Sequence, residues 1–248
     1  MTDGAHALVI VQARMGSTRL PGKVMADIAG KPMLQRVLER VSKAHLVDSV
    51  LIATTCLSED ETVCAWAAKQ GYPFYRGSQC DVLDRYYQAA FAGRADRVVR
   101  ITSDCPLIDP GLIDRAIDVH RESGADYVSD GVQPTLPLGE SVEVFWFQGL
   151  KRAWQNATLE YERVHVTPYF YQNRDKFALK SLGLSGDYRD HRWTVDTPED
   201  LEFVQHLYAA AGCEEACLNW RDTLSIINRN PQIRSINAHI KQKKLEEC

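Results

Sequence analysis

The stretch of sequence that most constrains the fold reads Val9-Ile10-Val11-Gln12-Ala13-Arg14-Met15-Gly16-Ser17-Thr18-Arg19-Leu20-Pro21-Gly22-Lys23-Val24. It begins within an apolar, β-branched run, residues 8–11, which is typical of a short buried strand. The strand leads into a loop with two arginines, a lysine, two hydroxyl side chains, two glycines and a proline. Ligands of open α/β sheets bind outside the carboxyl ends of strands, and glycines let backbone N–H groups approach an anion. The loop therefore predicts a phosphate-binding site.

Strand-like and helix-like patterns alternate through the first half of the chain. Further apolar runs predict strands at residues 49–53, 72–75, 97–101 and 127–129. Between them, apolar residues at helical spacing predict helices at residues 32–41, 58–69, 81–91 and 110–123. This alternation is typical of crossover units, so we expect an α/β fold with a Rossmann-like, doubly wound, mainly parallel sheet.

The pattern changes in the second half, although a single domain, residues 1–248, is still expected. We interpret residues 131–184 as a small inserted arm, with an alternating strand at 141–147 that pairs antiparallel at the sheet edge. After the arm, residues 193–195 predict a strand and Pro198 the start of a helix. Two amphipathic helices separated by Asn230-Pro231 complete the chain.

The composition excludes several classes of protein. The net charge is −4, so no general basic surface for nucleic acid is expected. No apolar run approaches the ~20 residues that cross a bilayer, and the amino-terminal residues lack a signal-peptide pattern. Seven cysteines without a CxxC pair indicate reduced thiols and a cytoplasmic location. Cys213 and Cys217, one helical turn apart, would suit a zinc site, but we expect thiols there as well.

The loop after the first strand does not match two common nucleotide-binding motifs. A P-loop has four residues between its glycines and a hydroxyl after its lysine, whereas five residues separate Gly16 from Gly22 and Val24 follows the lysine. The chain also lacks GxGxxG. Arg14, Arg19 and Lys23 could instead pair with a polyphosphate. The alternative is a solvated basic turn.

Two aspartates are candidate metal ligands. Polyphosphate chemistry normally requires Mg²⁺, which is held by carboxylates. Asp104 follows the predicted strand at 97–101, and Asp196 follows the one at 193–195. If both strands run parallel to the first, both carboxylates meet the cationic loop at one edge. Each aspartate alone could be a helix N-cap.

The chain resembles the cytidylyltransferase family that makes CMP-activated sugar acids, namely the acylneuraminate and ketodeoxyoctonate CMP-transferases. It is most similar to the branch of spore-coat polysaccharide biosynthesis. The most specific motifs are Gln12 to Lys23, Arg100-Ile101-Thr102-Ser103-Asp104-Cys105-Pro106-Leu107 and Trp193-Thr194-Val195-Asp196-Thr197-Pro198, and residues 76–86 and 162–169 match less specifically. The resemblance implies a sheet of the nucleotide-diphospho-sugar transferase type.

The resemblance also implies a reaction in which an acceptor hydroxyl attacks the α-phosphate of CTP and pyrophosphate leaves. In the family's pattern, the catalytic residues are Arg14, Lys23 and Asp104, and the Mg²⁺ ligands are Asp104 and Asp196. The nucleotide-binding residues implied are Ala13, Arg14, Ser17, Arg19 and Lys23 around the triphosphate, with Arg76, Ser78 and Arg85 near cytosine and ribose.

A small acidic acceptor is expected because arginine matches a carboxylate or phosphate. The candidate acceptor-binding residues are Glu143, Arg163, His165 and Arg192. His165 could orient or deprotonate the incoming hydroxyl, or it could simply pack in a helix beside Tyr169. The arm resembles the family's dimerisation element, which implies a homodimer.

Two other functions compete with this interpretation. A metal-dependent glycosyltransferase would use a nucleotide sugar and usually needs an Asp-x-Asp triplet, which is absent from the sequence. A non-catalytic nucleotide-binding protein would not need both Asp104 and Asp196. The sequence therefore favours a CTP-dependent transferase.

Overall fold

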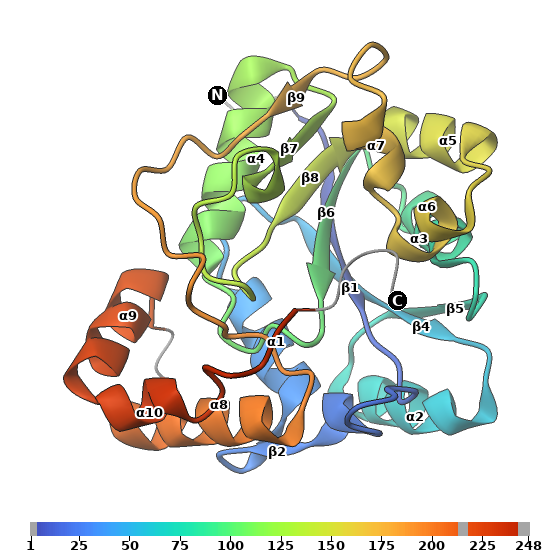
Figure 1. Ribbon diagram of the computed structural model, residues 1–248. Helices are drawn as coiled ribbons and strands as arrows, with labels where there is room; N and C mark the ends of the chain where they lie inside the picture. Colours follow the sequence, from blue (N-terminus) through green and yellow to red (C-terminus); the bar gives the residue numbers. More distant parts are fainter. Residues whose placement is uncertain (1–3, 213–217, 243–248) are drawn as a thin grey trace.

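The central sheet contains seven strands in the part of the chain that the structure describes. They are β1 (Ala7–Gln12), β4 (Ser49–Thr55), β5 (Phe74–Gly77), β6 (Arg97–Thr102), β7 (Tyr127–Ser129), β8 (Glu143–Trp146) and β9 (Leu179–Lys180). The computed structural model describes residues 4–212 and 218–242. The strand order is β5-β4-β1-β6-β8-β7-β9 (Figure 1), and β1 runs parallel to β4 and β6. This confirms the mainly parallel sheet.

Helices cover both faces of the sheet (Figure 1). The helices of the described residues are α1 (Met33–Val41), α2 (Glu61–Gln70), α3 (Val82–Ala92), α4 (Pro110–Ser123), α5 (Phe147–Asn156), α6 (Glu160–His165), α7 (Pro168–Gln172), α8 (Pro198–Ala211), α9 (Trp220–Arg229) and α10 (Pro231–Ser235). A small hairpin joins β2 (Asp27–Ile28) to β3 (Lys31–Pro32). The doubly wound arrangement is therefore confirmed.

The residues of β1 explain why the sheet is buried on both sides. Successive side chains of a strand point to opposite faces. Val9 and Val11 pack in one cluster with α1, α4 and α8, whereas Leu8 and Ile10 pack in a second cluster with α3 and α5. A strand covered on both faces has no polar side, which is why its sequence is continuously apolar.

The strand expected at the sheet edge lies inside the sheet instead. β8 is antiparallel, as predicted, but it pairs with β6 on one side and with β7 on the other. The edge position was wrong because the segment was interpreted as an inserted arm, whereas β8 is a central strand of the sheet. Glu143 is buried, and its carboxylate pairs with Arg100 of β6. The edge position is taken by β9.

The segment before Asp196 is also not the strand that the sequence predicted. Its only ladder contact within the described residues is a single bridge between Leu138 and Arg192. Gly139, with a φ of 112°, allows a close approach, since a Cβ there would lie 2.7 Å from the Thr194 nitrogen. The Val195 N–H donates to the Asp104 carbonyl at 2.8 Å, and this contact sets Asp196 beside the end of β6.

α8 begins at Pro198, and α9 and α10 are separated at Asn230, both as predicted. Among the described residues, no helix is both long and apolar enough to span a bilayer. Cys213 and Cys217 lie outside the described residues.

Candidate active site

Lys23 is the centre of the candidate site. It begins the 3-10 helix η1 (Lys23–Met25), which follows Gly22, a residue with a φ of 72°. Its ammonium donates to Asp104 Oδ2 at 3.0 Å, to Asp196 Oδ1 at 2.8 Å and to the Val195 carbonyl at 2.7 Å. The cationic loop and both aspartates thus meet at the carboxyl ends of β1 and β6.

The charges in this cluster stabilise one another. Burial would lower the pKa of Lys23, but the adjacent charges of Asp104 and Asp196 raise it above its usual value. Burial would raise the pKa of Asp104, but the Lys23 charge and a hydrogen bond from Thr102 lower it. Lys23 and Asp104 therefore favour each other's charged form at neutral pH.

Asp196 is oriented by two arginines and by the start of α8. Its Oδ2 lies 3.0 Å from Arg19 Nη2 and 2.9 Å from Arg192 Nη2. Arg192 also donates through Nε to Asp200 Oδ1 at 2.8 Å, and Asp200 accepts the Asp196 N–H at 3.0 Å. Arg192, an expected acceptor-binding residue, is therefore placed beside a candidate metal ligand.

We expect Asp200→Ala to lower the free energy of unfolding by about 3–5 kcal/mol, because it leaves the buried Arg192 without its main partner. In a chain of this size that corresponds to a fall in Tm of about 10 °C in a thermal melt. Asp187→Ala is the control, since the Asp187–Arg189 pair is exposed, and it should change the free energy of unfolding very little because exposed ion pairs contribute little to stability. Equal effects of the two substitutions would contradict the prediction.

The Asp200 contribution also has a defined pH dependence. Burial would raise the pKa of Asp200, but hydrogen bonds from Arg192 and Asn237 hold it below its usual value. A carboxylate with a lowered pKa in the folded state stabilises the fold at neutral pH, and this contribution is lost as the pH falls through that pKa. The difference between wild type and Asp200→Ala should therefore shrink in acid.

The donor set at this edge suits Mg²⁺ bound together with a nucleotide. Mg²⁺ is commonly held by one or two carboxylates, and waters and substrate phosphates complete its shell. Asp104 and Asp196 supply two carboxylates that converge on one point, the Lys23 ammonium. No group of three or more His, Cys, Asp or Glu side chains suited to a metal occurs in residues 4–212 and 218–242. The residues thus fit a shared metal rather than a closed protein cage.

Asp60, which was not among the residues expected at the site, holds the cationic loop in place. Its Oδ1 accepts the Met15 N–H at 2.6 Å, and its Oδ2 accepts the Thr55 hydroxyl. The side chain is fully buried at the end of the 3-10 helix η2 (Ser58–Asp60). In the sequence it looked like part of a helix start, and only its contact with Met15 reveals its role.

Arg85 is a buried cation that lacks an anionic partner within the described residues. Its Nη1 donates to the Ser78 carbonyl at 2.9 Å, whereas no hydrogen-bond partner is found there for Nε and Nη2. Burial lowers the pKa of Arg85, and the nearby positive charge of Arg14 lowers it further. Two guanidinium groups in proximity, one of them buried, favour an anionic ligand between the loop and α3.

The other expected nucleotide-binding residues mainly support the backbone around this position. Arg76 donates to the Thr55 and Leu57 carbonyls at 3.1 Å and pairs with Glu61 at 2.6 Å. The remaining three make backbone contacts: the Ala13 N–H with Ala53, the Ser17 hydroxyl with Leu20 and the Ser78 hydroxyl with Asp81. Their contacts to a nucleotide stay predictions.

The expected acceptor-binding residues do not form one group. Glu143 lies between Arg100, Tyr127 and Thr167. Arg163 pairs with Asp81, the N-cap of α3, at 2.5 Å. His165 ends α6, and the Thr167 N–H donates to its carbonyl at 2.9 Å across Val166, whose φ is 73°. This is a strained γ-turn, and such turns are often found near binding sites.

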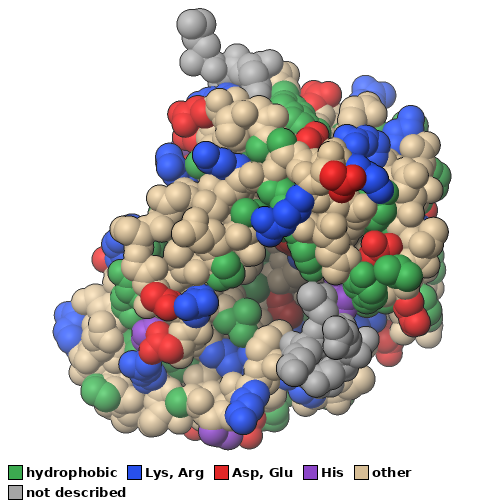
Figure 2. Space-filling view, turned by 45° about the horizontal axis from the view of Figure 1, so that its top comes forward, with side chains coloured by type: hydrophobic (Ala, Val, Ile, Leu, Met, Phe, Trp, Pro, Cys, Tyr) green, Lys and Arg blue, Asp and Glu red, His purple; other side chains and the backbone are tan. Residues whose placement is uncertain are grey.

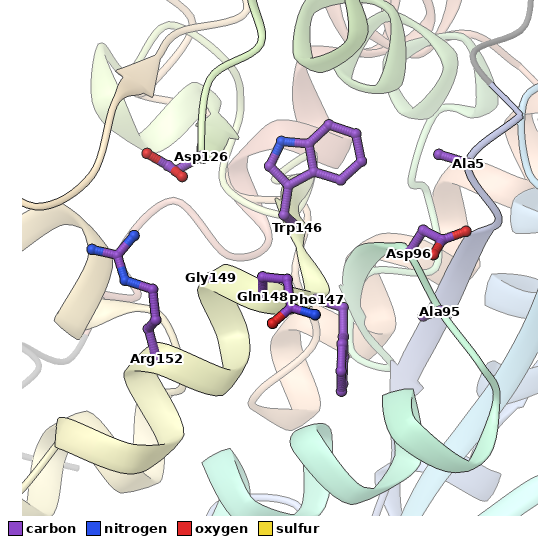
Figure 3. A pocket seen from close by; sticks show the side chains of 9 residues that line it. All are labelled: Ala5, Ala95, Asp96, Asp126, Trp146, Phe147, Gln148, Gly149 and Arg152. Carbon is purple, nitrogen blue, oxygen red and sulfur yellow. The ribbon is translucent and has the colours of Figure 1, made fainter.

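A separate cavity of about 360 Å³ lies at the opposite end of the sheet, beside the amino ends of β1 and β6. The cavity is lined by Ala5 before β1, by Asp96 before β6, and by Trp146, Phe147 and Arg152 at the end of β8 and in α5 (Figure 3). The candidate site lies at the other ends of these strands. Figure 2 shows acidic and basic side chains interspersed on the face in view, without a continuous basic patch.

Comparisons with known proteins agree with this geometry. A family model described as Cytidylyltransferase matches residues 8–224. The chain is 33% identical over 230 residues to the spore coat polysaccharide biosynthesis protein SpsF of Bacillus subtilis, covering 90% of this chain and 95% of that one. It is 41% identical over 114 residues to 3-deoxy-manno-octulosonate cytidylyltransferase of Anaeromyxobacter dehalogenans, covering 45% of this chain and 46% of that one.

A solved structure extends the comparison to three dimensions. A cytidylyltransferase from Leptospira borgpetersenii has a TM-score of 0.88 and 30% identity, and the match covers 97% of this chain and 100% of that one. The family model, the similar sequences and this structure agree on one class of enzyme. The chain is a nucleotidyltransferase enzyme that belongs to the cytidylyltransferase family.

Proposed function

We propose that this enzyme transfers CMP from CTP to a sugar hydroxyl and releases pyrophosphate, as a step in making a surface polysaccharide or glycan. The observation that carries the proposal is the convergence of Lys23 with Asp104 and Asp196 at the end of β1. Displacement at phosphorus needs alignment and charge neutralisation more than covalent help from the protein. The similarity to the spore coat protein SpsF supports the polysaccharide context.

In this reaction the acceptor oxygen forms a bond to the α-phosphorus, and the bond between the α-phosphorus and the bridging oxygen to the β-phosphate breaks. Pyrophosphate leaves with the bonding electrons, and the hydroxyl proton passes to water. Negative charge grows on the phosphate oxygens as the bond breaks. Fixed cations stabilise this charge best when they are in place beforehand. Lys23, Arg14 and Arg19 are the cations of the loop that would do so.

Arg85 would bind the nucleotide on the α3 side of the loop. Its unpartnered Nε and Nη2 are buried, so an anionic group there removes the cost of an uncompensated charge. Asp104 and Asp196 would hold Mg²⁺, which neutralises phosphate charge and lowers the pKa of a bound hydroxyl. Arg19 and Arg192 keep Asp196 oriented toward that position.

The acceptor is the finer part of the proposal. A sugar hydroxyl is supported by the similarity to a 3-deoxy-manno-octulosonate cytidylyltransferase over 45% of the chain. An acidic acceptor, which the family resemblance implied, stays a prediction; Arg163 and Arg192, which also suggested it, pair with Asp81 and Asp200. The homodimer also stays a proposal, which sedimentation velocity would check.

We expect CTP with Mg²⁺ to raise the Tm of the protein more than ATP, GTP or UTP does. A ligand at about 100 times its Kd stabilises by about 2.7 kcal/mol, which corresponds to about 5–10 °C in a chain of this length. Arg85→Met is the matched variant, since it removes the buried cation and should weaken the CTP-induced shift. A larger shift with UTP or ATP would contradict the assignment to CTP.

A further inference from the structure

A buried polar cluster around Glu143 lies beside the candidate active site and has no role in the reaction proposed above. Glu143 pairs with Arg100, and its other oxygen accepts the Tyr127 hydroxyl at 2.5 Å and the Thr167 hydroxyl at 2.7 Å. Burial and the Glu143 charge raise the pKa of Tyr171 to about 12, so its phenol stays protonated near the cluster. Such a network costs desolvation energy and needs a reason to be kept.

Two polar atoms at this place remain without a hydrogen-bond partner in the described residues. They are the Nε of Arg100, which is a donor, and the Oε1 of Gln12, which is an acceptor. Both are buried. The β1–β6 register pairs Ile10 with Arg100 and Gln12 with Thr102. Gln12 and Arg100 therefore project from the same face of the sheet on adjacent strands. Gln12 lies two residues nearer the carboxyl ends of these strands than Arg100.

The two vacant hydrogen-bonding positions match a hydroxyl group. A hydroxyl can accept from Arg100 Nε and donate to Gln12 Oε1 at the same time. A carboxylate can only accept, so it would leave the Gln12 oxygen unpaired. It would also lie near Glu143, whose charge already neutralises Arg100. This part of the site is therefore suited to a neutral hydroxyl rather than to an acid group.

The position in the sheet assigns this hydroxyl to the acceptor. The sheet order runs β5-β4-β1-β6-β8, with the phosphate-binding loop after β1 in the middle. Arg85 and Ser78 lie on the β5 side, whereas Arg100 and Glu143 belong to β6 and β8 on the other side of β1. The two sides meet at Tyr86 of α3, whose ring centre lies 5.7 Å from the Arg100 guanidinium. A nucleotide on the first side leaves the second side free for the acceptor.

We propose that Arg100 and Gln12 bind a hydroxyl of a sugar acceptor other than the attacking one, and that Glu143 holds Arg100 in position for this contact. Arg100 is then a specificity-determining residue for polyhydroxylated acceptors. This inference rests on the proposed function, whose acceptor class it narrows.

The test compares Arg100→Lys with wild type in a pyrophosphate-release assay with CTP, Mg²⁺ and a panel of neutral sugars, hexitols and sugar acids. Lysine keeps the charge that Glu143 needs but has no Nε donor at the same position. With the best acceptor of the panel, we expect Arg100→Lys to raise the acceptor KM about 10- to 100-fold. The KM for CTP and the CTP-induced rise in Tm should stay unchanged.

Gln12→Met is the second variant, and it stays informative should Arg100→Lys fail to fold. We expect it to raise the acceptor KM about 5-fold. The double variant should lose little more than Arg100→Lys alone, since both residues bind one hydroxyl and their effects are coupled. Additive losses, an unchanged acceptor KM in both variants, or a raised KM for CTP would each overturn the inference.

If the proposed function is wrong, the wild-type protein will show neither a CTP-induced Tm shift nor pyrophosphate release. The hydroxyl site is then tested by saturation-transfer NMR with D-mannose and 3-deoxy-manno-octulosonate in the absence of CTP. The inference is supported if saturation transfer to a sugar is seen with the wild-type protein and is lost with Arg100→Lys. Equal transfer in both proteins, or none from either sugar to wild type, contradicts it.

Discussion

Asp104→Asn and Asp196→Asn are each expected to lower kcat/KM for pyrophosphate release from CTP about 10³-fold, or about 4 kcal/mol of transition-state stabilisation. Asparagine keeps the shape of the side chain and can still accept a hydrogen bond from Lys23. It removes the negative charge that would hold Mg²⁺ between the two positions. The loss should therefore come from weakened metal binding, and the Mg²⁺ concentration for half-maximal activity should rise.

The measurement is a Mg²⁺ titration of initial rates at saturating CTP, with a thermal melt to verify folding. Asp187→Asn is the matched control, since it makes the same change in an exposed ion pair with Arg189. It should leave the rate and the Mg²⁺ dependence unchanged. Full activity in either Asp104→Asn or Asp196→Asn would refute the metal assignment.

Lys23→Ala is expected to lower kcat about 10²- to 10³-fold, which is typical of removing one fixed group that stabilises charge in the transition state. The Lys23 ammonium contacts Asp104, Asp196 and the Val195 carbonyl at 2.7–3.0 Å. It thus competes with a divalent cation for the same carboxylates. Without nucleotide, Lys23→Ala should therefore bind Mn²⁺ more tightly than wild type, as measured by electron paramagnetic resonance.

Two variants separate the chemical role of Lys23 from a structural one. Lys31→Ala removes a lysine whose partner is Glu39, away from the site, and should leave kcat unchanged. Lys23→Arg keeps the positive charge and should recover part of the lost rate. A Lys23→Ala protein that folds, retains its kcat and shows no gain in Mn²⁺ affinity would rule out both parts of the prediction.

The central part of the site could be predicted from the sequence because its signals are local. An apolar run followed by a glycine-containing cationic loop marks a strand end that can bind an anion. A carboxylate directly after a second strand of the same direction must lie at the same edge, and the parallel pairing of β1 and β6 confirms this for Asp104. The position of Asp196 was also correct, although residues 193–195 reach it as an irregular segment.

The partners of the charged residues could not be predicted in the same way. Arg163, Arg192 and Glu143 were all expected at the acceptor, but the structure pairs Arg163 with Asp81 and Arg192 with Asp200. Glu143 pairs with Arg100, which belongs to a family motif in the sequence but had no role predicted for it. Residues that point to a ligand in the sequence can therefore be engaged within the fold.

The amino-acid sequence is sufficient for the α/β class, for the loop after β1 and for the two aspartates, because hydrophobic periodicity and strand-end motifs depend on neighbouring residues. Only the tertiary structure decides that β8 enters the middle of the sheet and which guanidinium nitrogens have no hydrogen-bond partner among the described residues. Contacts such as Asp81 with Arg163 join residues 82 positions apart. They depend on strand order and register, which no local pattern of residues encodes.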